Sequence, residues 1–247
     1  MLSYIAPKTL LKNKTILITG AGDGIGKTAS LTFAEYGATV ILLGRTVKKL
    51  EQVYDQIVAN GGPEPAIVPL DLLGATPQHY RDMAATIEGQ FGSLDGVLHN
   101  ASVLGHIEPF RQISENDWQE VMQINLNSTF FMTQALLPVL GKSSSASVLF
   151  TSSSVGSKGR AYWGTYSISK FATEGMMQVL ADEYEKSSIR FNCINPGATR
   201  TAMRAKAFPG EDPKTLKTAE DLMPAYLYLF GSDSQQENGK TFIAQPK

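Results

Sequence analysis

The sequence has very little cysteine: Cys193 is the single cysteine among 247 residues. One cysteine excludes an internal disulfide bond, and a chain without disulfides is typical of a reducing compartment, so we expect a cytoplasmic protein. The sequence also lacks any cluster of His and Cys with the spacing of a zinc site, so we expect no metal. Cys193 itself lies in an apolar run and is expected to be a small buried hydrophobic residue.

A surplus of charge and a long apolar run are also missing. The 22 Lys and Arg residues nearly balance the 23 Asp and Glu residues, so we expect no nucleic-acid partner. The longest apolar stretch, 130–140, is interrupted by Thr133 and Pro138, so we expect no membrane span. Pro7 and Lys8 interrupt the apolar residues near the N-terminus, which does not resemble a signal peptide.

Short apolar runs alternate with longer amphipathic segments along the whole chain. This alternation predicts a single α/β domain over 1–247, with a doubly wound parallel sheet and helices on both faces in three layers. The segment 198–217 is the least regular and is a candidate substrate lid, because ligands of such sheets bind beyond the carboxyl ends of the strands. The predicted strands are 15–19, 39–43, 66–70, 94–99, 147–151 and 189–194, with a further strand at TFIAQ near the C-terminus, and the predicted helices are about 24–36, 46–60, 76–91, 115–140, 164–186 and 218–231.

The first predicted strand leads directly into a glycine-rich loop, Gly20-Ala21-Gly22-Asp23-Gly24-Ile25-Gly26. Such a loop lets backbone N–H groups approach a pyrophosphate at the positive end of the following helix. An alternative is a P-loop phosphotransferase, because Ala21–Thr28 places Lys27 and Thr28 as a P-loop does, with Asp71 as a carboxylate for magnesium. Ala21 in place of the first P-loop glycine weakens that alternative.

Tyr166 and Lys170 are four residues apart on a predicted helix and therefore share one face. A nearby ammonium favours the phenolate and lowers the pKa of the tyrosine, which makes Tyr166 a candidate general acid or base. Ser153, thirteen residues before Tyr166, is the candidate hydroxyl for holding the substrate oxygen. Asn125 lies inside a predicted helix, where asparagine is unfavourable unless it has another task.

Seven stretches together resemble the short-chain dehydrogenase/reductase family along nearly the whole chain. They are TGAGDGIG at 19–26, LD at 70–71, HNAS at 99–102, Asn125, SSSVG at 152–156, YSISK at 166–170 and NPGATRT at 195–201. The resemblance implies a Rossmann-type sheet of about seven strands, hydride transfer with NAD or NADP, and a homodimer or homotetramer. It also implies a small-molecule carbonyl or alcohol as substrate.

The resemblance implies roles for individual residues. Tyr166, Lys170, Ser153 and Asn125 would form the catalytic group, in which Asn125 holds a water that relays protons to Lys170. The residues implied at the cofactor are Gly20, Asp23, Gly24, Ile25, Gly26, Arg45, Asp71, Leu72, Asn100, Ala101, Tyr166, Lys170, Pro196, Gly197, Thr199 and Thr201. Ser102 replaces a frequent glycine, which puts cofactor affinity in doubt, and His99 replaces a frequent asparagine and is expected to be structural.

Arg45 directly follows the second predicted strand, where an acidic residue would bind the ribose hydroxyls of NAD. A guanidinium suits a 2′-phosphate, so we expect NADP, with NAD as the alternative. Asp23 is a contrary sign, because many NADP-preferring relatives have a basic residue there. The remaining alternative is a catalytically idle dinucleotide-binding protein, for which Ser153 and Tyr166 would serve no purpose.

Three segments, Ser102–Phe110, Gly156–Trp163 and Ala198–Thr215, are expected around the substrate. They contain four large apolar or aromatic side chains and three arginines, which hints at a bulky carbonyl compound with an acidic or polar group. Packing of the lid or of an oligomer contact is an equally good explanation. These side chains are Tyr162, Trp163, Met203, Phe208, Arg160, Arg200 and Arg204.

Overall fold

The computed structural model describes residues 2–246, and its centre is one sheet of seven parallel strands in the order β3-β2-β1-β4-β5-β6-β7. The strands are β1 (Thr15–Thr19), β2 (Thr39–Gly44), β3 (Ala66–Pro69), β4 (Gly96–His99), β5 (Ala146–Thr151), β6 (Ile189–Asn195) and β7 (Thr241–Ile243). The doubly wound sheet predicted from the sequence is confirmed, including the strand near the C-terminus. β1 lies between β2 and β4, so the direction of winding reverses there and a crevice opens at the carboxyl ends of these strands.

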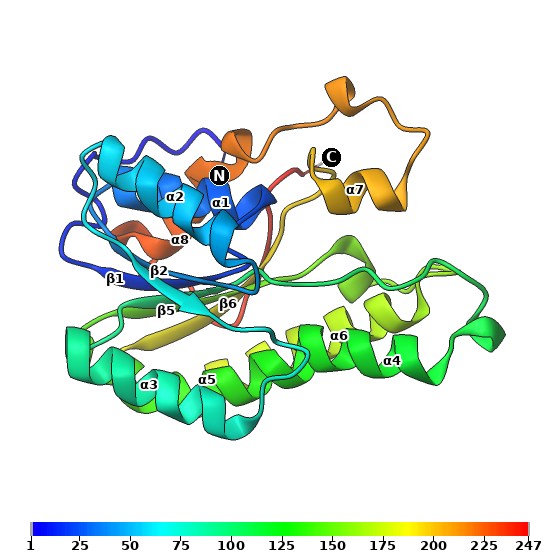
Figure 1. The fold of residues 1–247 in the computed structure, drawn as a ribbon, viewed down its shortest axis with the longest axis horizontal. Helices are drawn as coiled ribbons and strands as arrows, with labels where there is room; N and C mark the ends of the chain where they lie inside the picture. Colours follow the sequence, from blue (N-terminus) through cyan, green and yellow to red (C-terminus); the bar gives the residue numbers. More distant parts are fainter. Residues whose placement is uncertain (1, 247) are drawn as a thin grey trace.

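Helices cover both faces of the sheet (Figure 1). One face carries α1 (Gly24–Glu35), α2 (Val47–Ala59) and α8 (Met223–Phe230); the other carries α3 (Pro77–Phe91), α4 (Glu115–Met122), α5 (Ser128–Leu140) and α6 (Gly164–Glu183). A short helix, α7 (Ala202–Ala207), stands beyond the carboxyl ends of the strands, at the right in Figure 1. None of the helices in 2–246 is long and apolar enough to span a bilayer.

Two apolar cores lie on the two faces of the sheet. Successive strand residues point to opposite faces, and in β1 Ile16 and Ile18 therefore pack under α1 and α8, while Leu17 packs toward α3 and α5. All three side chains are buried, and each such burial contributes about 1.5–3 kcal/mol. Burial on both faces explains why the strands lack polar alternation.

The predicted helix over 115–140 is divided in the structure. Gln123–Asn127 forms a π-helical segment between α4 and α5. The Ser128 hydroxyl donates to the carbonyl of Ile124 (2.6 Å), and the Thr129 hydroxyl donates to that of Asn125 (3.1 Å). Hydroxyls that bond to the preceding turn bend helices, and isolated π turns are frequent at functional sites.

The segment 198–217, expected to be irregular, contains α7. Its first turn is capped by Thr201, whose hydroxyl accepts a hydrogen bond from the backbone N–H of Arg204 (3.2 Å). The helix is six residues long, too short for the periodicity that identifies a helix in sequence. Thr199 forms a bridge to Lys217, which closes the base of the segment.

Candidate active site

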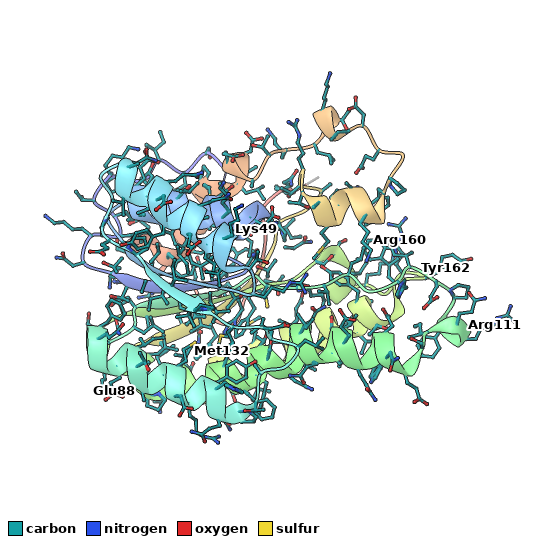
Figure 2. The ribbon with its side chains drawn as sticks, viewed as in Figure 1. Lys49, Glu88, Arg111, Met132, Arg160 and Tyr162 are labelled. Atoms are coloured by element: carbon teal, nitrogen blue, oxygen red, sulfur yellow. The ribbon has the colours of Figure 1, made fainter. Side chains whose placement is uncertain are left out.

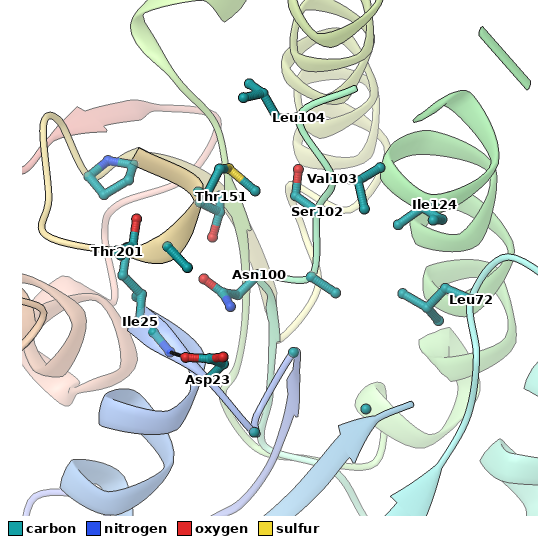
Figure 3. Close-up of a pocket in the computed structure, with 18 of the residues that line it drawn as sticks. Asp23, Ile25, Leu72, Asn100, Ser102, Val103, Leu104, Ile124, Thr151 and Thr201 are labelled. Carbon is teal, nitrogen blue, oxygen red and sulfur yellow. Dashed lines mark hydrogen bonds between the residues drawn. The ribbon is translucent and has the colours of Figure 1, made fainter. Parts of the chain in front are cut away.

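A cavity of about 560 Å³ opens at the carboxyl ends of the strands. It extends from the start of α1 and α2 to α6 and α7, and Figure 3 shows part of its wall. Of the predicted site residues, the cavity is lined by Gly20, Asp23, Gly24, Ile25, Arg45, Asp71, Leu72, Asn100, Ala101, Ser153, Tyr166, Lys170, Pro196, Gly197, Thr199 and Thr201. Gly26 and Asn125 are not among the lining residues.

The glycine-rich loop needs glycine for two different reasons. Gly20 and Gly24 have φ angles of 68° and 50°, a region that side-chain-bearing residues rarely adopt. Gly26 instead allows close packing, because a Cβ there would lie 2.7 Å from Nδ2 of Asn100. Gly26 therefore lets α1 approach the loop, while Gly20 and Gly24 face the cavity. Its expected place at the pyrophosphate turn stays a prediction.

Basic side chains gather at the α2 end of the cavity. Arg45 lines it as expected, and so does Lys49, which the sequence analysis missed. The available signal for Lys49 was a basic residue in the first turn of the helix that follows Arg45. Nζ of Lys49 is 2.5 Å from Oδ2 of Asp23, and this hydrogen bond lowers the pKa of the Asp23 carboxyl. Asp23, which in the sequence argued against NADP, is thus paired with a cation. Its Oδ1 also accepts a hydrogen bond from the backbone N–H of Gly24 (2.8 Å).

Thr19 fixes the strand end beside the glycine loop. Its hydroxyl accepts hydrogen bonds from the backbone N–H groups of Asn100 and Ala101 (both 2.9 Å), and the Asn100 amide donates to the Thr19 carbonyl (3.3 Å). On the other side of the cavity the Thr199 hydroxyl donates to Pro196 and Gly197 carbonyls at 3.4 and 3.3 Å. These contacts hold the two loops that border the cavity.

The end of the cavity beside α7, within the segment 198–217, is called the lid end. Tyr166 is nine-tenths buried there, and burial raises the pKa of its phenol to about 12. The nearby hydroxyls of Ser153 and Ser102 oppose this rise in pKa. The Oγ of Ser102 is buried and has no hydrogen-bond partner within the described chain. Ser102, expected to disturb cofactor affinity, therefore places its hydroxyl beside the phenol.

Lys170 is buried, and its Nζ donates to the carbonyl of Thr151 (2.8 Å) while lying 5.4 Å from the ring centroid of Tyr166. Burial lowers the pKa of Lys170 to about 8. From the sequence we expected the ammonium to lower the pKa of Tyr166, but the pKa of the phenol is raised. The reason is that burial disfavours charge on both groups, and the ammonium is turned toward a carbonyl.

Asn125 is buried and joins two elements around the site. Its Oδ1 accepts from the backbone N–H of Val103 (2.8 Å), and its Nδ2 donates to the Val103 carbonyl (2.9 Å) and to Oγ of Ser169 (3.1 Å). The side chain therefore clamps the loop after β4 onto α6, next to Lys170. Its role in holding a water for Lys170 stays a prediction.

Several residues singled out in the sequence lie outside the cavity. His99 is buried, its Nε2 is 2.9 Å from the Thr133 hydroxyl, and burial lowers its pKa to about 3, so its structural role is confirmed. The Thr28 hydroxyl donates to Glu220 (3.3 Å), and neither it nor Lys27 lines the cavity, which disfavours a P-loop. Cys193 is buried in β6.

The cavity wall at the lid end is apolar. Leu104, Trp163, Met203 and Ala207 line it around Tyr166. Of the other side chains expected around the substrate, Arg204 lines the cavity, whereas Tyr162, Phe208, Arg160 and Arg200 do not.

One group of metal-ligand type lies elsewhere, in the loop after β4 and in α4. His106, Glu108 and Asp117 place donor atoms within 4.8 Å of one another. Nδ1 of His106 is 2.8 Å from Oδ1 of Asp117, so this pair is already engaged in a hydrogen bond.

Comparisons with known proteins cover nearly the whole chain. The family model of short chain dehydrogenases matches residues 14–212. The uncharacterised oxidoreductase YciK of Escherichia coli (strain K12) is 56% identical over 243 residues, which are 98% of this chain and 96% of that protein. Two solved short chain dehydrogenases superimpose closely. That from Shigella flexneri 2a strain 301, complexed with NADP, has a TM-score of 0.95 and 57% identity, covering 97% of this chain and all (100%) of that one. The short chain dehydrogenase from Escherichia coli CFT073, complexed with NADPH, has a TM-score of 0.96 and 56% identity, covering 98% of this chain and 100% of that one.

Proposed function

This chain belongs to the short-chain dehydrogenase family, and from that premise we propose that it interconverts a carbonyl compound and an alcohol with NADP(H), using Tyr166 as general acid or base. In the direction of reduction, the carbonyl carbon accepts a hydride from NADPH and the oxygen accepts a proton, giving the alcohol and NADP⁺. The observation that carries the proposal is the position of Ser153, Tyr166 and Lys170 in the wall of the same cavity as the glycine-rich loop.

The cavity fits a dinucleotide. Gly20 and Gly24 keep side chains out of the turn before α1. The first backbone N–H groups of α1 have no partners within the helix and can therefore bind an anionic group. Two polar atoms in the wall, Oγ1 of Thr151 and Oγ of Ser102, are buried without partners in 2–246, and buried hydroxyls ordinarily have partners. When bound, the nicotinamide supplies or takes the hydride. The relatives solved with NADP and NADPH support this cofactor.

The preference for NADP rests on Arg45 and Lys49, which line the α2 end of the cavity. A phosphate on the ribose would meet the planar guanidinium of Arg45 there, and Lys49 compensates the nearby carboxylate of Asp23. Asp23 does not oppose it as a free carboxylate, because it is paired with Lys49. NAD remains the weaker alternative.

The protonation states favour proton donation by Tyr166. Because burial raises the pKa of its phenol to about 12, the group is protonated at neutral pH and serves as an acid toward a carbonyl oxygen. Ser153, beside the phenol, would hold the same oxygen in place. Lys170, with a pKa lowered to about 8, is close enough to neutral pH to exchange a proton. An idle dinucleotide binder would need none of these three groups.

The proposed function is tested with a panel of ketones and aldehydes and the consumption of NADPH. We expect Tyr166→Phe to lower the rate about 10²- to 10⁴-fold, while NADPH still raises the melting temperature of the variant. Tyr162→Phe is the matched control, because Tyr162 is 59% exposed and lies outside the cavity wall. Equal rates for wild type and Tyr166→Phe would remove this phenol from the mechanism.

We further propose that 1–247 work as one dinucleotide-binding and catalytic domain in the cytoplasm, with 198–217 as its lid. We also propose a homodimer or homotetramer. Support for assembly comes from α5 and α6, which expose the large apolar side chains Phe130, Phe171 and Val179, because exposed apolar surface marks candidate contact surfaces. Sedimentation velocity of wild type and Phe171→Glu tests it: we expect the variant to dissociate, and a monomeric wild type would contradict the proposal.

A further inference from the structure

The lid end of the cavity has almost no free charge, and this sets the chemistry of its ligand. We propose that the site selects an uncharged carbonyl compound or alcohol with an apolar body, and that Glu211 enforces this selection by neutralising Arg204. This inference rests on the proposed function, which identifies the reacting group as a carbonyl or an alcohol. It adds the chemical character of the rest of the substrate.

The wall around the reacting phenol is built from apolar side chains. Leu104 comes from the loop after β4, Trp163 from the start of α6, and Met203 and Ala207 from α7. The rings of Trp163 and Tyr166 meet edge to face with centroids 6.0 Å apart. A ligand at Tyr166 therefore contacts hydrocarbon and an indole ring, and the polar atoms beside it are the hydroxyls of Ser102 and Ser153.

Arg204 is the one basic side chain of α7 that reaches the cavity wall, and its charge is already paired. Its Nε and Nη2 donate to the two carboxylate oxygens of Glu211, both at 2.6 Å. Its guanidinium also lies over the ring of Phe208, with Cζ 3.8 Å from the centroid. Two-pronged pairs of this kind hold both partners in fixed orientation, so the charge of the guanidinium is compensated before a ligand binds.

The aromatic rings connect α7 to α6. Phe208 packs on Trp163 with centroids 5.7 Å apart. Arg160 lies against both rings, with Cζ 5.7 Å from the Trp163 centroid and 5.5 Å from that of Phe208. Figure 2 shows Arg160 beneath α7, near Tyr162. Because Arg160 is not part of the cavity wall, it stabilises the position of α7 from outside and leaves the interior apolar.

These contacts decide against a charged substrate. A carboxylate placed between Trp163 and Met203 would lose its hydration, while the guanidinium of Arg204 is already paired with Glu211 and the ammonium of Lys170 is turned toward the Thr151 carbonyl. Burial of a charge without a partner is strongly unfavourable. A ring or branched hydrocarbon would lose no polar contacts and would bury apolar surface. The acidic group that the arginines suggested in the sequence is therefore not expected inside this cavity.

A pair of probes of equal shape tests the inference. Isopropylcyclohexanone and oxocyclohexanecarboxylate, each substituted opposite the carbonyl, differ in charge and hardly in size. Binding to the complex of the protein with NADP⁺ is measured by saturation-transfer NMR, and the KM for reduction is measured with NADPH. We expect the isopropyl ketone to bind about 10- to 100-fold more tightly. We expect Glu211→Gln to reduce this preference by freeing the charge of Arg204, and Glu185→Gln, an exposed control on another surface, to leave it unchanged.

The results separate this inference from the proposed function. Equal or tighter binding of the carboxylate, or binding of neither ketone, overturns the inference; so does a preference for the carboxylate that disappears in Arg160→Gln. Loss of turnover in Tyr166→Phe, with binding of the isopropyl ketone retained, supports both proposals. Binding of that ketone with turnover unaffected by Tyr166→Phe would contradict the proposed function alone.

Discussion

Replacement of Lys170 by methionine should stabilise the folded protein at neutral pH while it removes activity. Lys170 is fully surrounded by protein, and burial lowers its pKa from 10.5 to about 8. Because one pKa unit corresponds to about 1.4 kcal/mol, keeping this ammonium protonated in the folded state costs about 3 kcal/mol at pH 7. Methionine fills nearly the same space without a charge.

The gain in stability is partly offset by a lost hydrogen bond. Nζ of Lys170 donates to the carbonyl of Thr151 at 2.8 Å, and an unpaired buried carbonyl costs about 1–2 kcal/mol. We therefore expect Lys170→Met to be about 1–2 kcal/mol more stable than wild type at pH 7.

The pH dependence identifies the cause. Between about pH 8 and 10.5 the unfolded lysine binds more protons than the folded one, so the stability of wild type rises with pH relative to the variant. The cost of the buried charge is present below the folded pKa and disappears above the unfolded one. At pH 10 the advantage of Lys170→Met should have vanished.

Urea denaturation followed by tryptophan fluorescence at pH 7 and pH 10 measures both differences. Lys186→Met is the matched control, because Lys186 is exposed and should show no change with pH. If the difference between wild type and Lys170→Met were the same at both pH values, Lys170 would not be destabilised by burial, and the reasoning on its protonation would be refuted.

Three further outcomes follow from the site. Arg45→Ala and Lys49→Ala should each weaken NADPH binding about 10-fold and leave NADH binding nearly unchanged, as calorimetric titration would show. Arg45→Ala removes a charged contact to the phosphate, and Lys49→Ala leaves the Asp23 carboxylate without its partner; equal losses for both cofactors would remove the phosphate assignment. Asn125→Ala should lower the free energy of unfolding by about 2–3 kcal/mol because it leaves both backbone groups of Val103 unpaired; a change within error in urea denaturation would contradict the clamp. Ser102→Ala should move the alkaline midpoint of the pH–rate profile upward by about half a unit or more, because it removes a hydroxyl beside the phenol that opposes the rise in its pKa. Ser102→Thr should restore the midpoint, and an unchanged midpoint in Ser102→Ala would exclude this effect of Ser102.

The sheet could be predicted because the burial of its strands is visible in the pattern of apolar residues. The strands that pack on both faces are continuous apolar runs, and β1, β2 and β6 begin at the predicted residues. The division of the helix over 115–140 was not predicted. It coincides with the hydrogen bonds of Asn125 to Val103, which join two separate segments of the chain and cannot be read from the sequence. The six-residue helix α7 was missed because its ends are set by the Thr201 cap and by contacts with α6.

The site shows the same division between local and distant information. Spacing along a strand end or a helix placed Arg45, Tyr166 and Lys170 correctly on the cavity wall. The environment of each group could not be read in this way, because burial comes from other segments. The pKa of Tyr166 rises where a Tyr–Lys pair in isolation suggests a fall.

The burial that makes the charge of Lys170 unfavourable in the folded protein also determines which ligands the cavity can bind. A wall that excludes water around Tyr166 keeps the phenol protonated and makes a second buried charge costly. Arg204 is tolerated at this wall because Glu211 neutralises it, and Asp23 and Lys49 neutralise each other at the opposite end. The two ends differ in one respect: Arg45 is left without an acidic partner among residues 2–246, so an anionic ligand group has a counter-charge at the α2 end. At the lid end Arg204 is paired with Glu211 and Lys170 is turned toward the Thr151 carbonyl, and the phosphate of a dinucleotide and the hydrocarbon of a ketone are therefore directed to opposite ends of one cavity.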